Sequence, residues 1–357
     1  MSSNVSGDPF DKIIQNLTKM TEYVNVLDNQ GKTALIRASQ DGNVEVVRAL
    51  LDNPTIDVNL RGNQGKTALM HAAERRNVEV VRSLLDNPTI EVNLIDNNGH
   101  FALSYAVKID YNMDNLNQLD TIKALLDNQK VDANLMIEGK MTVLLYAVKR
   151  NTSNEYLQVI KALLDCDKVN VNMKEREIIN DMNEWIENRT PLIYAVIQTY
   201  PDGALALVKH PKIDVNIQDR VAKTALIYAI FTRSPQSVLI ALLNHPKINV
   251  NIQDNRGKTA LIYAVVGLNI PVVEKLLTMP NDPTVITQPT AHEGKEGQHQ
   301  QVRHLAERPW LNMELQDNDG HSALWYARQP PNSREKEHIR NLLQMRINEL
   351  NNRYNKK

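Results

Sequence analysis

The sequence contains almost no cysteine and no long apolar run. Cys166 is the single cysteine among 357 residues, which excludes an internal disulfide and a cysteine zinc cluster. No apolar stretch approaches the roughly 20 residues that a membrane-spanning helix needs. The first residues, MSSNVSGDPFDKII, lack the basic start and apolar run of a classical signal peptide. These absences argue against a disulfide-stabilised secreted scaffold and predict a cytoplasmic protein.

Neither sign of charge dominates. Lys and Arg total 41 and Asp and Glu total 42, for a net charge of -1. This balance argues against general attraction to nucleic acid or to anionic membranes, so neither is an expected partner. A hydrophobic content of 42% is ordinary for a folded globular protein. Asparagine, by contrast, occurs about 40 times; it shares A/T-rich codons with Ile and Lys, so we interpret the excess as a mark of origin rather than of mechanism.

Internal repeats are the main feature of the sequence, and they decide the fold. A tripeptide of the Thr-Ala-Leu type recurs in one register at intervals of 34, 34, 41, 48, 34, 35 and 63 residues. The intervals above 35 indicate one unit with insertions. The eight copies begin at Thr33, Thr67, Phe101, Thr142, Thr190, Thr224, Thr259 and Ser322.

The second copy, VNLRGNQGKTALMHAAERRNVEVVRSLLDNPTIE, shows how each unit is expected to fold. Asn63-Gln64-Gly65 lies in a polar turn between two short extended segments. Thr67 is placed to cap a short helix that includes Leu69 and Ala72. A second helix carries Val78, Val81, Leu84 and Leu85 at helical spacing, and Pro88 ends it. One such unit cannot bury its apolar faces alone, so the pattern predicts a stacked solenoid.

These motifs resemble the ankyrin repeat, whose period is about 33 residues and whose signature is T-P-L-H-x-A. The resemblance covers residues 24 to 345. It implies a mainly α solenoid of about eight helix-turn-helix units with short β-hairpin fingers. Two features depart from the signature: proline follows the threonine only at Pro191, and every copy lacks the signature histidine. The residues in its place are Ile36, Met70, Ser104, Leu145, Ile193, Ile227, Ile262 and Trp325.

The resemblance also suggests domain boundaries. Residues 1–23 form an N-terminal cap with an amphipathic helix over 9–22, and residues 24–280 form repeats one to seven. Insertions lie near 110–119, 150–158 and 174–188. Residues 281–309 form an inserted loop, and 310–357 hold repeat eight with a capping helix over 333–353. Insertions in repeat proteins map to loops, often on the binding face, although long surface loops also arise at little cost.

No catalytic constellation is present in the sequence. Phosphate-binding, dinucleotide-binding and zinc-protease motifs are all missing. Cys166 is flanked by two aspartates, which disfavour the thiolate that a nucleophile needs. His292, His299 and His304 cluster in the inserted loop, but their spacing matches no compact ligand set. We therefore predict no enzyme activity, no cofactor and no metal site.

Acidic residues recur at one position of the hairpin rather than forming a unique pair. Asp28, Asp96, Asp254 and Asp317 occupy equivalent places before Asn or Gly. Repetition at one structural position indicates turn chemistry, because Asp side chains bond the local backbone.

Three sets of residues are candidates for partner binding. The first is a basic column, made of the residue before each cap, which would attract an acidic segment or else form ion pairs with the hairpin aspartates, worth ~0–1 kcal/mol each at a surface. Its members are Lys32, Lys66, His100, Met141, Arg189, Lys223, Lys258 and His321. The second is a tyrosine column, which suits either interface contacts or packing between repeats. Its members are Tyr105, Tyr146, Tyr194, Tyr228, Tyr263 and Tyr326.

The third set follows the first helix of each repeat and is heterogeneous, as expected of a surface that reads a specific partner. It turns apolar toward the C-terminal half. Its members are Gln40/Asp41, Glu74/Arg75, Lys108/Ile109, Lys149/Arg150, Ile197/Gln198, Phe231/Thr232 and Val266/Gly267. Trp185, in the 174–188 insertion, is the predicted single anchor because aromatic residues dominate interface energetics; the alternative is that it folds back onto its own loop.

These observations predict a monomeric, non-catalytic protein that binds a partner protein through a concave face and hairpin tips. The partner is expected to present an acidic or extended segment. Asn-rich repeats of this style resemble those of intracellular bacteria and of large DNA viruses of amoebae, which implies an effector exported into a host cytosol and acting on a host protein. The alternatives are an enzyme with a site in the insertions and a self-assembling structural protein.

Overall fold

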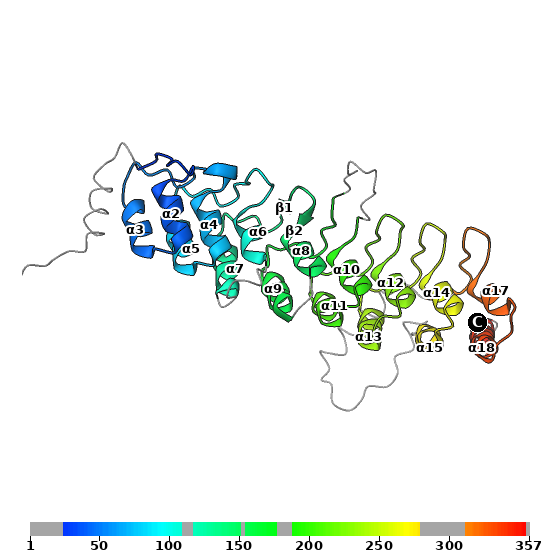
Figure 1. The fold of residues 1–357 in the computed structure, drawn as a ribbon. Helices are drawn as coiled ribbons and strands as arrows, with labels where there is room; N and C mark the ends of the chain where they lie inside the picture. The colour runs from blue at the N-terminus through cyan, green and yellow to red at the C-terminus, as the bar shows by residue number, and fades with distance from the viewer. Residues whose placement is uncertain (1–23, 109–116, 151–153, 177–187, 279–310, 355–357) are drawn as a thin grey trace, which may run out of the picture. The chain divides into compact units, whose positions relative to one another are not determined.

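A computed structural model (Figure 1) describes residues 24–108, 117–150, 154–176, 188–278 and 311–354. The chain divides into two compact units, residues 1–178 and 179–357. Each unit stacks helix pairs in two rows, with the first helices of the pairs packed on one another and the second helices behind them. Short hairpins project from the first helices (Figure 1). The chain is mainly helical, as predicted.

The helices of unit 1 follow the repeat register. The first helices are α2 (Ala34–Asp41), α4 (Ala68–Arg75), α6 (Ala102–Val107) and α8 (Val143–Lys149). The second helices are α3 (Val44–Leu51), α5 (Val78–Leu85), α7 (Gln118–Asp127) and α9 (Asn154–Leu164). The hairpins contain a 3-10 turn, η1 (Asn63–Gly65), and two strands, β1 (Met136–Ile137) and β2 (Met141–Thr142). The strands pair antiparallel with Met136 opposite Thr142.

Unit 2 repeats the same arrangement. Its first helices are α10 (Pro191–Ile197), α12 (Ala225–Phe231), α14 (Ala260–Val266) and α17 (Ala323–Arg328). Its second helices are α11 (Pro201–Val208), α13 (Gln236–Asn244), α15 (Ile270–Leu277) and α18 (Arg334–Tyr354).

The predicted threonine caps are present. In each of six repeats the threonine hydroxyl accepts a hydrogen bond from the backbone N–H three residues later; Thr67 accepts from Met70 N at 3.3 Å. Ser322 does the same. Phe101 cannot cap, and there the Ser104 hydroxyl accepts the Phe101 N–H at 2.9 Å. The caps satisfy amides that the first turn leaves free, so local sequence alone starts each first helix.

The apolar positions form the core between the two rows. Leu69 of the first helix and Val81 and Leu84 of the second are at most 2% exposed, and other repeats match. The position of the signature histidine is buried and apolar in most copies, as at Met70 and Ile262. The hydrogen bonds of a histidine are thus replaced by hydrophobic burial, worth roughly 1.5–3 kcal/mol for a large side chain.

Asparagine has a structural role that composition did not reveal. One asparagine in each outer loop bridges to the next repeat: its Nδ2 donates to a carbonyl and its Oδ1 accepts an N–H. For Asn59 these bonds go to Thr89 O at 2.8 Å and Glu91 N at 2.8 Å. The same bridge is made by Asn25, Asn93, Asn134 and Asn216. The asparagine excess is therefore partly a requirement of the stack, and our interpretation of it as unrelated to mechanism was incomplete.

The hairpins are also linked from repeat to repeat. Asn63 N–H donates to Gly31 O at 2.9 Å, and Asn97 N–H donates to Gln64 O at 2.9 Å. In unit 2, Asn318 N–H donates to Arg256 O at 3.0 Å. Each unit thus presents its hairpins as a connected, preformed surface.

The predicted C-terminal capping helix is present as α18, which buries Ile339 and Leu343 and packs on α15 and α17. The start of α9 corrects one boundary: residues 154–158 were expected in a loop, but they extend the helix. The N-terminal helix over 9–22 and the insertion residues 109–116, 151–153, 177–187 and 279–310 lie outside the described residues, and with them the predicted anchor Trp185. Among the described residues, no helix has the length and apolarity to cross a membrane.

Candidate functional site

The hairpin aspartates are turn residues, as predicted. In each case Oδ1 accepts the N–H groups two and four residues later; Asp254 accepts from Arg256 and Lys258, both at 2.9 Å. Asp28, Asp96 and Asp317 repeat this arrangement. Asp219 does so as well. It was missed in the sequence, although it stands five residues before its cap as the others do.

The second carboxylate oxygen binds the tyrosine nine residues later. The hydroxyl of Tyr263 donates to Asp254 Oδ2 at 2.6 Å, and Tyr228 donates to Asp219 at 2.6 Å. Tyr105 and Tyr326 make the same bond to Asp96 and Asp317. In the first repeat, Arg37 pairs with Asp28 instead. Four of the six tyrosines of the column therefore hold the hairpin of their own repeat.

These bonds keep the carboxylates charged and the phenols neutral. Burial opposes ionisation of Asp96, but hydrogen bonds from Tyr105 and from backbone amides outweigh it and hold the pKa below its usual value. Burial, together with the bond to Asp219, raises the pKa of Tyr228 to about 12. The hairpins that carry this aspartate thus hold a negative charge that their own repeat hydrogen-bonds. Asp219 also lies 3.7 Å from Arg189 Nε of the preceding repeat.

In unit 1 the basic column is neutralised by its neighbours. The Lys66 ammonium lies 2.9 Å from Glu74 Oε1 and 4.2 Å from the centroid of the Tyr105 ring. Lys108 Nζ lies 5.0 Å from the same ring and 3.1 Å from His100 Nε2. Burial lowers the pKa of Lys108 despite the opposing charge of Glu74. The expected ion pair between a column residue and a hairpin aspartate forms at Arg189, whose Nε lies 3.7 Å from Asp219 Oδ2. Lys66 instead pairs with Glu74.

In unit 2 the lysines of the column lie over aromatic rings. Lys223 Nζ is 4.8 Å from the Phe231 centroid and 5.2 Å from the Tyr263 centroid. Lys258 Nζ is 4.9 Å from the Tyr326 centroid. Among the described residues, neither ammonium lies within 4.0 Å of a carboxylate. Within the part of the chain that the structure describes, aromatic rings rather than carboxylates therefore contact both ammonium groups.

Two large apolar side chains lie exposed in the same unit. Phe231, at the end of α12, is 62% exposed, and Val266, at the equivalent place in α14, is 51% exposed. The Phe231 ring meets the edge of the Tyr263 ring, with centroids 6.1 Å apart. Phe231, Lys223 and Lys258 were predicted as binding residues. Val266 was noted at a groove position but was not selected as a binding residue.

The remaining predicted site residues fall into three groups. Glu74, His100, Tyr105 and Lys108 form one cluster with Lys66, in which His100 and Tyr105 are buried. Lys32 bonds Gln40 Oε1 at 2.5 Å. Three of the predicted residues are exposed: Arg75, Lys149 and Arg150.

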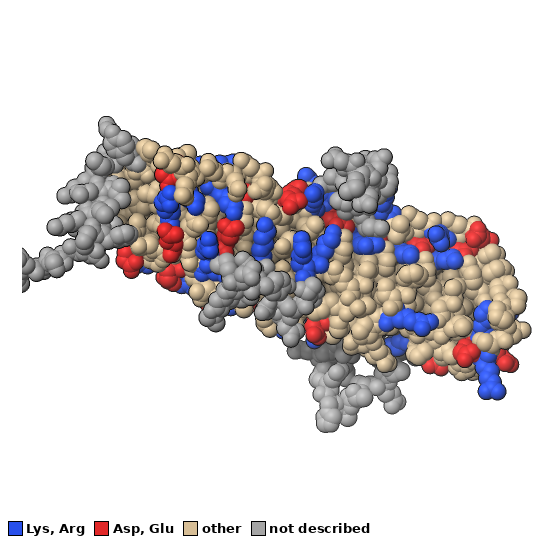
Figure 2. Space-filling model, in the orientation of Figure 1, with Lys and Arg blue, Asp and Glu red and all other residues tan. Residues whose placement is uncertain are grey.

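The surface shown in Figure 2 reflects this difference between the units. Over unit 1, basic and acidic residues lie next to one another. Over unit 2, the same view is mostly neutral, with fewer charged residues of either sign. The charges of unit 1 are largely used within the molecule, whereas unit 2 combines exposed apolar groups with cations that contact aromatic rings.

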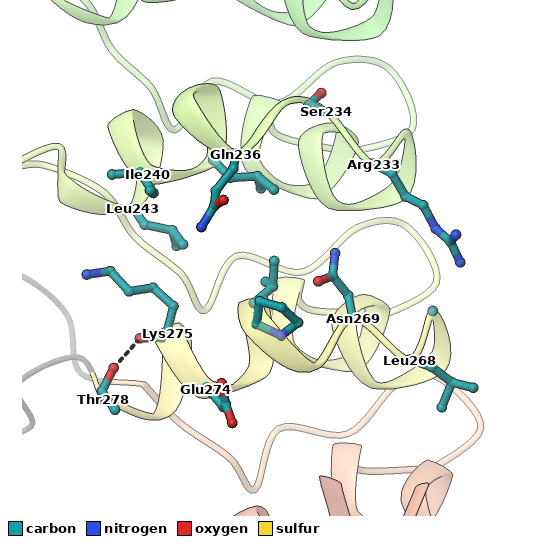
Figure 3. Close-up of a pocket in the computed structure, with 14 residues that line it drawn as sticks. Arg233, Ser234, Gln236, Ile240, Leu243, Leu268, Asn269, Glu274, Lys275 and Thr278 are labelled. Carbon is teal, nitrogen blue, oxygen red and sulfur yellow. Dashed lines mark hydrogen bonds between the residues drawn. The ribbon is translucent and has the colours of Figure 1, made fainter. Parts of the chain in front are cut away.

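A hollow lies between the outer helices α13 and α15 (Figure 3), which pack less closely than the other neighbouring second helices of each unit. It has a volume of about 750 Å³ and is lined by apolar residues such as Leu239, Leu243 and Val272. Its titratable side chains are Arg233, Glu274 and Lys275. This set contains no nucleophile with a neighbouring base, so the groove offers no basis for catalysis.

One group of described residues could face a cation: Asp317, Asp319 and His321. Both oxygens of Asp317 already accept hydrogen bonds, from the hairpin backbone and from Tyr326. This is the same turn that the other repeats form, so it gives no sign of a metal site. The predicted histidine cluster of the inserted loop lies outside the described residues.

Comparisons with known proteins agree with the repeat structure. A family profile described as "Ankyrin repeats (3 copies)" matches residues 6–96, 56–113, 103–219 and 212–287. An ankyrin repeat protein from Leishmania major is similar with a TM-score of 0.57 at 18% identity, covering 88% of this chain and 96% of that one. The ankyrin repeat domain of Bcl-3, a member of the IkappaB family, gives 0.47 at 18% identity, covering 88% and 100%.

The ankyrin repeat protein EF0377 gives a TM-score of 0.47 at 20% identity, covering 59% of this chain and 97% of that one. Comparison with curated proteins found no match. The fold evidence comes from the family profile and from the first of these structures. Ankyrin repeats are generally modules for protein–protein interaction, and the profile matches span most of the chain. The chain therefore belongs to the ankyrin repeat family.

Proposed function

We propose that this protein is a non-catalytic monomer that binds a partner protein along its hairpins and first helices. One observation carries the proposal: the residue at the end of each first helix varies freely while the framework around it stays constant. This residue is Gln40, Glu74, Lys108, Lys149, Ile197, Phe231 or Val266. A structural role would impose one residue type at a fixed position, whereas recognition of a specific partner requires variety.

The exposure of Phe231 supports the same proposal. A 62% exposed aromatic ring contributes little to the fold, whereas aromatic side chains dominate the energy of interfaces. The stack beneath it is held by the helix caps, by the asparagines that bridge successive outer loops, and by the hydrogen bonds between hairpins. Docking on such a preformed surface avoids much of the ordering cost of binding.

The partner we propose is a host protein with an acidic, extended segment. The positive charges of Lys223 and Lys258 support the acidic character. The resemblance of the Asn-rich repeats to those of intracellular bacteria and amoebal viruses supports a host protein as the target, with this chain acting as an effector in the host cytosol.

The test is affinity capture from host cytosol, followed by measurement of Kd with the purified partner. Phe231→Ala and the double variant Lys223→Glu/Lys258→Glu should each weaken binding. Trp185→Ala tests the predicted anchor in the 174–188 insertion. Ile240→Ala is the matched control, because Ile240 is 40% exposed on the outer helix α13.

Equal affinity of the wild type, Phe231→Ala and the double lysine variant would overturn the assignment of this surface. Light scattering at several concentrations separates the monomer from a self-assembling protein. A mass that rises with concentration would contradict the proposed monomer.

A further inference from the structure

Three apolar side chains stand at the same repeat position in successive first helices of unit 2. Phe231 and Val266 end the neighbouring helices α12 and α14, which pack side by side. Ile197 occupies the same position in α10 and is half-buried. Packed helices lie about 8–10 Å apart, so we expect a similar spacing between these three side chains. We call them the apolar row.

Two lysines lie beside the apolar row. Lys223 and Lys258 precede the caps of α12 and α14 and lie beside the apolar row, each over one or more aromatic rings. A ring attracts the cation but leaves its net charge in place. The equivalent Lys66 of unit 1 is only 12% exposed and is paired with Glu74. Among the described residues of unit 2, no carboxylate plays that part for Lys223 or Lys258.

The spacing of the apolar row can be compared with the repeat of side chains along a bound partner segment. A polyproline II helix repeats every three residues and rises about 3.1 Å per residue, so side chains i and i+3 share one face about 9 Å apart. In a β-strand, side chains on one face are about 6.6–6.8 Å apart. The spacing of the apolar row therefore fits the polyproline II period and not the strand period.

We propose that unit 2 binds a polyproline II segment of a partner protein that carries apolar side chains at every third position and carboxylates between them. The apolar side chains contact Ile197, Phe231 and Val266, and the carboxylates approach Lys223 and Lys258. This inference rests on the proposed function and names the chemistry of the partner. A polyproline II segment is already extended when free, so it loses little conformational entropy on binding.

The experiment uses fluorescently labelled peptides and the full-length protein. The first peptide repeats Leu-Asp-Pro four times, which places leucine at every third position and favours polyproline II. The second has the same composition with its leucines adjacent. The third replaces each aspartate with lysine. Each labelled peptide is titrated with the protein up to 1 mM, and fluorescence anisotropy gives the Kd of each peptide.

The first peptide should bind, and the other two should bind at least about tenfold more weakly. Phe231→Ala should raise the Kd of the first peptide about tenfold, which is in the range of an interface hot spot. Lys223→Gln/Lys258→Gln should weaken it and remove most of the salt dependence of Kd. Lys66→Gln and Ile240→Ala should leave it unchanged. Circular dichroism confirms that each variant is folded.

Equal binding of the three peptides, binding of none, or insensitivity to both Phe231→Ala and the double lysine variant would overturn the inference. Failure of the proposed function looks different. If the variants lose a captured partner but the peptides do not bind, then the surface is correct and its assigned chemistry is wrong. If the variants keep the partner, the surface itself is wrong.

Discussion

The bond between Tyr263 and Asp254 offers a sharp test of how the hairpins are stabilised. The substitution Tyr263→Phe removes only a hydroxyl group and keeps the ring, so it leaves no large cavity. Asp254 is 6% exposed, and its Oδ2 accepts the Tyr263 hydroxyl at 2.6 Å. Its Oδ1 is already bonded to two backbone amides. The variant therefore leaves one buried carboxylate oxygen without its donor.

The size of the effect follows from the charge and the burial of the acceptor. A hydrogen bond to a charged group contributes about 1.5–3 kcal/mol, and leaving a buried acceptor unsatisfied costs about 1–3 kcal/mol. We expect Tyr263→Phe to lower the free energy of unfolding by about 1.5–3 kcal/mol. Urea unfolding followed by circular dichroism measures this as a lower midpoint at an unchanged m-value.

Tyr146→Phe is the matched control. Tyr146 has the same place in its repeat, but Ile137 stands where five other repeats have the aspartate. Its hydroxyl has no hydrogen bond to the described residues, so the control should lose less than about 0.5 kcal/mol, as for a surface substitution. If Tyr263→Phe is as stable as wild type, or if the two variants lose the same amount, the carboxylate does not depend on the tyrosine and our account of the column is wrong.

Two further stability predictions test buried and strained positions. Burial, followed by the Lys66 charge, lowers the pKa of His71 to about 4. The unfolded chain therefore binds the proton first, and stability should fall by about 1–3 kcal/mol as pH drops from 6.5 to 4. His71→Gln should reduce that loss in urea unfolding at several pH values, and an unchanged pH dependence would contradict it. Gly257 has φ of 73°, and an added Cβ would lie 2.7 Å from Asn318 Oδ1, so Gly257→Ala should cost at least about 2 kcal/mol. Gly139→Ala, with a similar φ and nothing within 4 Å, should cost about 1–2 kcal/mol; equal melting temperatures of the two variants would show that the close approach is relieved.

Several features of the fold follow from short-range chemistry and were predictable. The cap at Thr67 bonds an amide three residues away, and the buried stripe of Val81 and Leu84 follows the helical period. The Asp254 turn closes over four residues. Interactions of this range depend on local backbone geometry alone, so residue type and spacing suffice to identify them.

The candidate site was only partly predictable. Phe231, Lys223 and Lys258 stand at positions that the repeat register marks as candidates for binding, and the structure places Lys223 over the Phe231 ring. The register could also have identified Asp219. It could not show that Tyr105 is buried with its hydroxyl bonded to Asp96, because residue type alone does not distinguish an interface tyrosine from a framework one.

The sequence by itself determined the repeat, its caps and its core, because each depends on residues within one turn or one helix face. Only the tertiary structure decided which charges are used within the molecule. Lys66 meets a carboxylate and Lys223 meets aromatic rings, although both stand at the same repeat position. Glu74 and Phe231 stand eight residues after these two lysines, and the rings of Tyr105 and Tyr263 come from the next repeat, which only stacking brings within a few ångströms. The asparagines that bridge successive outer loops depend on stacking too, since Asn59 finds its partners 30 and 32 residues along the chain.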